Sequence, residues 1–170
     1  MADQTYDQLK EEWATKVGWF SMRMGEVQSH ISQMVSIVGG PKPRDDRFVT
    51  QINDLEASLR LFHPTLVAQL TRCIAEMRRL KGLRNSILHS AIQAEGWFEG
   101  IPEDRPLTPE EIEGKELLWR SRVFDRQGKH TNIDPARMTE LVADAQELSE
   151  ELFHLLIRQW EELQANSPIE

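Results

Sequence analysis

Apolar residues recur every three or four positions along most of this chain, a pattern that predicts long amphipathic helices. The first stripe covers residues 9–38, and Gly39-Gly40 marks where that helix stops. A second, shorter stripe covers residues 48–62. It ends at His63-Pro64, because the residue before a proline avoids helical geometry.

Two further stripes predict a third helix and a last helix. The third helix is expected to begin near Pro64, and the last follows Asp134-Pro135, a pair that favours a helix start. The apolar face of the third helix is predicted to hold Leu66, Leu70, Cys73, Met77, Leu80, Arg84 and Leu88. That of the last is predicted to hold Met138, Leu141, Ala145, Leu148, Leu152, either Leu155 or Leu156, Trp160 and Leu163.

The pattern changes between residues 93 and 133, where glycine and proline interrupt it. Residues 117–126 alternate in polarity, which predicts a strand, and a turn at 127–129 leads to a short return strand ending at Ile133. The predicted fold is therefore mainly α, a bundle of four to five helices with a small β-hairpin insertion before the last helix. We expect one domain over 1–166, with 93–133 as its β-containing insertion and 167–170 as a frayed tail.

Composition narrows the class of protein. The chain has 170 residues and no apolar run near the roughly 20 residues that cross a bilayer, so no membrane partner is expected. The single cysteine, Cys73, lies on an apolar helix face and is predicted to be a buried core residue in a reducing cytoplasm. No spacing of histidine and cysteine suggests a metal site, and no cofactor is expected.

The formal net charge of −8 argues against non-specific coating of nucleic acid, but the charge is unevenly distributed. Basic residues gather in two stretches, and the C-terminal part is strongly acidic. The candidate RNA-binding cations are Arg78, Arg79, Lys81, Arg120, Arg122 and Arg126. The alternative is that these side chains belong to solvated helix faces without a partner.

Candidate chemistry is concentrated in the segment Arg84-Asn85-Ser86-Ile87-Leu88-His89. Arg84 falls on the apolar stripe, where an unpaired guanidinium is costly and needs a partner. Asn85 and His89 are four positions apart, so the amide can orient the imidazole. A fixed cation beside a group that exchanges protons near neutral pH suits phosphodiester cleavage without a metal.

This segment resembles the Arg-polar-x3-His signature of HEPN domains, which are all-α proteins that usually dimerise. The resemblance extends to a long helix before the motif and a long final helix. It implies that active members cleave RNA without a metal, and that the paired motifs of two subunits meet at the dimer interface. This chain differs in having Ser90 where many relatives have glycine, and Ala91 where some nucleases have tyrosine.

Two functions follow as hypotheses. The first is a metal-independent endoribonuclease of the HEPN type, acting in stress or phage defence, with Arg84, Asn85 and His89 as catalytic residues. The alternative is a non-catalytic dimeric HEPN-like module that binds RNA, a nucleotide or a protein. The expected partners are a second copy of the chain, RNA, and a cognate antitoxin or regulator protein.

Overall fold

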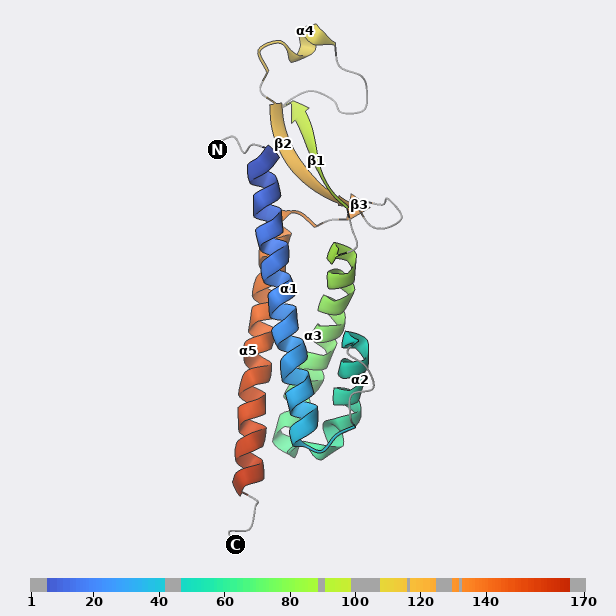
Figure 1. Ribbon diagram of the computed structural model, residues 1–170, viewed down its shortest axis with the longest axis vertical. Coiled ribbons are helices and arrows are strands. Elements are labelled where there is room, and N and C mark those ends of the chain that lie inside the picture. Colours follow the sequence, from blue (N-terminus) through green and yellow to red (C-terminus); the bar gives the residue numbers. More distant parts are fainter. Residues whose placement is uncertain are drawn as a thin grey trace. The chain divides into compact units, whose positions relative to one another are not determined.

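The protein is mainly helical, as the sequence predicts (Figure 1). The computed structural model describes residues 6–41, 47–88, 91–98, 108–115, 117–124, 130–131 and 133–165; for most strand residues it describes the backbone alone. The elements are α1 (Tyr6–Ile37), α2 (Phe48–Ser58), the short 3-10 helix η1 (Leu59–Leu61), α3 (Pro64–Leu88), β1 (Ala91–Phe98), α4 (Pro109–Ile112), β2 (Leu117–Phe124), β3 (His130–Thr131) and α5 (Pro135–Ala165).

Contacts within the chain divide it into two compact units. The bundle unit comprises residues 19–85 and 140–170, and the sheet unit comprises residues 1–18 and 86–139. The helices α1, α3 and α5 each contribute residues to both units. The number of independently folding domains stays a prediction.

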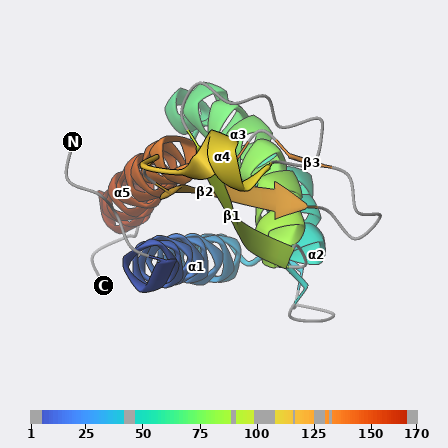
Figure 2. The same cartoon turned by 90° about the horizontal axis from the view of Figure 1, so that it is seen from above.

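The bundle unit is built from α1, α2, α3 and α5, whose apolar stripes meet in a common core, and Figure 2 views these helices nearly end-on. Its fully buried side chains include Phe20, Met24, Ile31, Ile52, Leu55, Leu66, Leu70, Met77, Leu80, Leu141 and Leu152. Most positions of the predicted stripes are therefore confirmed as core. Removing this much apolar surface from water is the main stabilising contribution to such a bundle.

Helix α1 ends where Gly39-Gly40 predicts. Gly39 has a φ of 68°, a left-handed conformation that glycine adopts without the steric penalty of a side chain. Its N–H donates to the carbonyl of Ser36 at 3.1 Å, and the N–H of Gly40 donates to that of Val35 at 2.8 Å. These two bonds form a Schellman motif, which satisfies carbonyl groups that the last helical turn leaves unpaired.

The predicted stripes are wrong at three positions near helix ends. Leu88, Trp160 and Leu163 were expected on apolar faces, but they are exposed, at 43%, 54% and 38%. Ile87 and Gln159 are buried in place of Leu88 and Trp160. The reason is geometric, because a helix of 3.6 residues per turn requires steps of three as well as four, and the stripe steps by three at Ile87.

The sheet unit holds a three-stranded antiparallel sheet with the order β1-β2-β3. The predicted strand at 117–126 is confirmed over residues 117–124 as β2, and the short return strand over residues 130–131 as β3. The predicted turn at 127–129 lies outside the described residues. Strand β1 was not predicted, although it pairs with β2 along its whole length, from Ala91 opposite Phe124 to Phe98 opposite Leu117. Its alanine, glycine and glutamate are poor strand formers, so pairing with β2 rather than local propensity accounts for it.

Helix ends and a small core complete the sheet unit. Among the side chains of this unit that the structure describes, the buried ones are Leu9, Trp13, Ile87, Ile133 and Met138. Asp134 caps α5, since its carboxylate accepts a 2.7 Å hydrogen bond from the N–H of Arg137. Lys16 on α1 donates to the carbonyl of Pro135 at 2.9 Å, which ties the start of α5 to α1.

Candidate functional site

Arg84 lies in the last two turns of α3, on the side that the apolar stripe predicts. Its side chain is half-buried, and its Nε atom is buried with no hydrogen-bond partner among the described residues. A guanidinium donor removed from water without a partner raises the free energy of the fold. Arg84 is therefore the one predicted site residue whose bonding is incomplete within the part of the chain that the structure describes.

The other two predicted catalytic residues, Asn85 and His89, are not half-buried side chains like Arg84 in the described part of the chain. Asn85 follows Arg84 on α3 and is exposed. His89 lies outside the described residues, so the expected contact of Asn85 with its imidazole stays a prediction. Of the proposed catalytic pair, the described residues therefore include Arg84, the cation, but exclude His89, the proton-transfer residue.

Arg78, a predicted RNA-binding cation, already has a carboxylate partner. Its two terminal nitrogens donate to Glu56 of α2 at 3.1 Å and 2.6 Å, a bidentate pair. This hydrogen bonding lowers the pKa of Glu56 and raises that of Arg78. An RNA phosphate that bound Arg78 would have to compete with Glu56.

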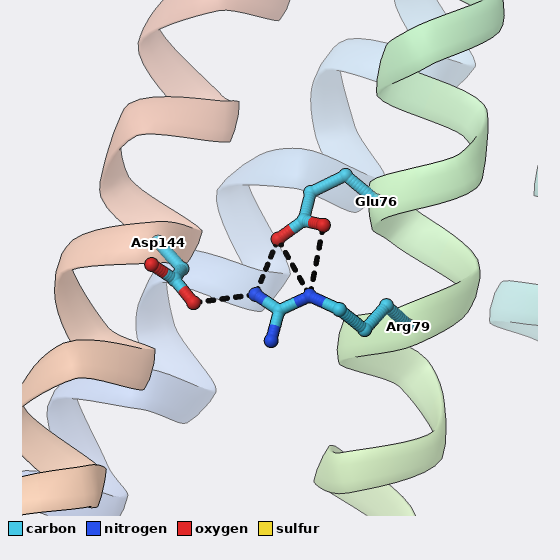
Figure 3. A network of polar contacts seen from close by, with 3 residues as sticks. All are labelled: Glu76, Arg79 and Asp144. Atoms are coloured by element: carbon cyan, nitrogen blue, oxygen red, sulfur yellow. Dashed lines mark hydrogen bonds and ion pairs between the residues drawn. The ribbon is translucent and has the colours of Figure 1, made fainter.

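Arg79 is more tightly held, and Figure 3 shows its guanidinium between two carboxylates. Its Nε donates to both oxygens of Glu76 on α3, at 3.0 Å and 2.8 Å. Its Nη2 bonds to Glu76 and also to Asp144 on α5. These hydrogen bonds raise the pKa of Arg79, with Glu76 the larger cause. Arg79 thus joins α3 to α5 within the bundle unit, in addition to any part in binding RNA.

The remaining predicted RNA-binding residues are only partly described. Lys81 is half-buried on α3. Arg120 and Arg122 lie two positions apart on β2, so they belong to the same face of the sheet, opposite Glu95 and Gln93 in the backbone register. Their side chains and all of Arg126 lie outside the described residues. A continuous basic track therefore stays a prediction.

A small polar cavity of about 230 Å³ lies between α3 and α5 and includes Cys73. Its other lining residues are Arg72, Glu76, Asp144, Glu147, Leu148 and Glu151. Burial, together with the nearby carboxylate of Glu151, raises the pKa of the Cys73 thiol to about 12. The thiol therefore stays protonated near neutral pH, which fits the predicted core cysteine and disfavours a nucleophile.

A larger apolar groove was not predicted from the sequence. It has a volume of about 560 Å³ and lies between α1 and α5 in the bundle unit. Its lining residues are Ser32, Gln33, Ser36, Ile37, Leu156, Ile157 and Trp160. The sequence signal that could have revealed it is the absence of Asp, Glu, Lys and Arg from residues 27–41.

Comparisons with known proteins give no family assignment. No protein-family model matches the chain, and no curated protein or solved structure is significantly similar to it. Among the described residues, no three side chains of His, Cys, Asp or Glu are grouped so that they could hold a metal ion. No helix in the described ranges has an apolar stretch long enough to cross a membrane.

Proposed function

We propose that this chain is a metal-independent endoribonuclease of the HEPN type, with Arg84 as its phosphate-binding residue. The supporting observation is the buried Nε of Arg84, which has no hydrogen-bond partner among the described residues. A phosphate offers several acceptor oxygens and a negative charge, and so satisfies a guanidinium better than a neutral ligand does. Bound RNA would then offer acceptors to the guanidinium of Arg84, whose bonding is incomplete at Nε among the described residues.

The proposed reaction needs one group that holds charge and one that moves protons. The 2′-hydroxyl of a ribose attacks the adjacent phosphorus, its proton passes to a base, and the bond to the 5′-oxygen of the next nucleotide breaks. The departing oxygen takes a proton, leaving a 2′,3′-cyclic phosphate and a 5′-hydroxyl. His89 is the candidate for proton transfer, and Arg84 would stabilise the negative charge on the phosphoryl oxygens.

The test is cleavage of a mixed-sequence RNA in excess EDTA, with products checked for cyclic phosphate ends. We expect the wild type to cleave, and His89→Ala and Arg84→Gln to lose about a hundredfold or more of the rate. Arg60→Ala, which removes an exposed arginine of η1, is the matched control and keeps full activity. Intact RNA with the wild type, or equal cleavage by His89→Ala, would rule the proposal out.

A second candidate function is a non-catalytic dimeric module that binds RNA, a nucleotide or a protein. The observation in its favour is that Arg78 and Arg79 are engaged by Glu56, Glu76 and Asp144 and so hold helices together. In that case the wild type leaves RNA intact, and His89→Ala lowers the melting temperature or weakens self-association. Cleavage and melting measured on the same samples separate the two functions.

A further inference from the structure

Five large apolar side chains are exposed along the outer side of the α1 and α5 pair in the bundle unit. They are Trp19 and Met22 of α1 and Phe153, Ile157 and Trp160 of α5, exposed between 39% and 54%. We call this surface the α1–α5 face. A solvent-exposed cluster of aromatic and long aliphatic side chains is typical of an interaction surface, whereas single exposed apolar residues are not.

The contacts between α1 and α5 place these residues together. The hydroxyl of Ser149 donates to Glu26 at 3.4 Å, and the rings of His30 and Phe153 lie 5.7 Å apart. The two helices therefore advance side by side in the same direction (Figure 1 and Figure 2). Trp19 and Met22 precede Glu26 by seven and four positions, which puts them on the same side of α1.

The groove between the two helices opens on this face beside Trp160. None of its seven lining residues carries a formal charge. The charge-free stretch covers residues 27–41, which are the end of α1 and the four residues after it, in a chain in which 28% of residues are charged. Burial lowers the pKa of His30, the one titratable side chain in that stretch, so it is neutral at pH 7. Depletion of charge with enrichment of aromatic residues is the compositional signature of an interface core.

The size of the apolar surface fits a stable dimer. At about 200 Å² for a fully exposed large side chain, the five residues present apolar surface on the order of 500 Å². A stable interface buries roughly 800 Å² on each partner, of which about 60% is apolar. The α1–α5 face therefore supplies about the apolar area that one side of such an interface needs.

We propose that the α1–α5 face binds a second copy of this chain about a twofold axis, with the Trp160 side chain of each subunit entering the groove of the other. Trp160 lines the groove and is also 54% exposed, so one surface offers both a large apolar side chain and a groove that could receive it. A twofold contact requires such self-complementarity. Charge does not oppose this contact, because the groove lining is uncharged and the nearby Arg23 and Glu26 form an ion pair that is neutral as a whole.

This contact is independent of the proposed nuclease site. The face belongs to α1 and α5, whereas Arg84 belongs to α3. A HEPN-type dimer would instead bring the Arg84 segments of two copies together. Substitutions on the α1–α5 face should therefore weaken the first kind of dimer, and substitutions near Arg84 the second.

The experiment is sedimentation equilibrium of the full chain over the micromolar range, with Ile157→Glu and Val49→Glu as a matched pair. Ile157 is on the face and is 39% exposed, and Val49 is on α2 and is 38% exposed. We expect the wild type and Val49→Glu to reach at least twice the chain mass of 19.7 kDa. Ile157→Glu should weaken dimerisation by at least about tenfold, since it places a charge in a desolvated contact.

Trp160→Ala removes the indole ring that is proposed to enter the partner's groove, and it adds no charge. It serves as the test variant if circular dichroism shows that Ile157→Glu is unfolded. It too should weaken dimerisation by at least about tenfold. A folded, monomeric wild type would overturn the proposal, because the α1–α5 face would then not bind a second copy of this chain. So would a dimer whose dissociation constant is unchanged in Trp160→Ala, because its contact would lie elsewhere.

Discussion

The side-chain oxygen of Gln159 on α5 accepts a 2.9 Å hydrogen bond from the backbone N–H of His63, the residue just before α3. Gln159 is almost fully buried, at 2% exposure, and the two residues are 96 positions apart in the chain. A buried amide at this point satisfies a backbone donor that a proline-led helix start would otherwise leave unpaired. The polar side chain thereby holds the turn before α3 against α5.

Replacing Gln159 with leucine is expected to destabilise the protein by about 1–3 kcal/mol, because the N–H of His63 then stays buried without an acceptor. The measurement is urea unfolding followed by circular dichroism. Gln164→Leu, an exposed position on the same helix, is the control and should change stability by less than about 0.5 kcal/mol. Equal effects of the two substitutions would show that the hydrogen bond contributes nothing specific.

The contact of Arg79 with Asp144 should give a measurable coupling energy between α3 and α5. In a double-mutant cycle with alanine at both positions we expect about 0.5–1 kcal/mol, limited by solvent screening because the Arg79 side chain is 38% exposed. The coupling should shrink at high salt. The pair Arg72 and Glu151, 3.9 Å apart and more exposed, is the comparison and should give a smaller value. A coupling of zero at low salt would contradict the prediction.

Stability should fall as the pH decreases below 6.5, through His30. Burial lowers the pKa of this histidine from its ordinary value of 6.5, an effect that outweighs the opposing carboxylate of Glu26. The unfolded chain therefore takes up the proton at a higher pH than the folded chain does. The free energy of unfolding has its full value above pH 6.5 and declines as the pH drops toward the lowered pKa.

Urea unfolding from pH 7.5 down to pH 5.5 measures this decline, in a range above the ordinary carboxylate pKa values. His30→Gln should flatten the dependence on pH. His154→Gln, an exposed position next to the Phe153 ring that contacts His30, should leave it in place. An unchanged dependence in His30→Gln would assign the effect to other groups.

The sequence predicts this fold well where local chemistry decides the structure. The stripe from Leu9 to Met34, the stop at Gly39-Gly40 and the cap at Asp134 all follow from residues a few positions apart. Strand β1 could not be found in this way, because its strand conformation comes from pairing with β2. The burial of Gln159 could likewise not be predicted from the sequence, since its hydrogen-bond partner, the N–H of His63, is 96 residues away.

The candidate site shows the same division. The position of Arg84 on the apolar side of α3 followed from helical periodicity, and its buried Nε agrees with that expectation. The contacts of Arg78 with Glu56 and of Arg79 with Asp144 could not be predicted, because these carboxylates lie 22 and 65 positions away on other helices. The contact of Arg79 with Glu76, three positions away on the same helix, was within reach of the sequence. A count of charges along the chain therefore overstated how many cations are available for RNA.

The parallel course of α1 and α5 has a consequence for how the bundle unit folds. Ser149 and Glu26, which join the two helices, are separated by 123 residues, so their contact closes a very long loop. Contacts among α1, α2 and α3 close much shorter loops and lose less chain entropy as they form. We therefore expect the first three helices to associate early, with docking of α5 as the late, slow event that completes the core.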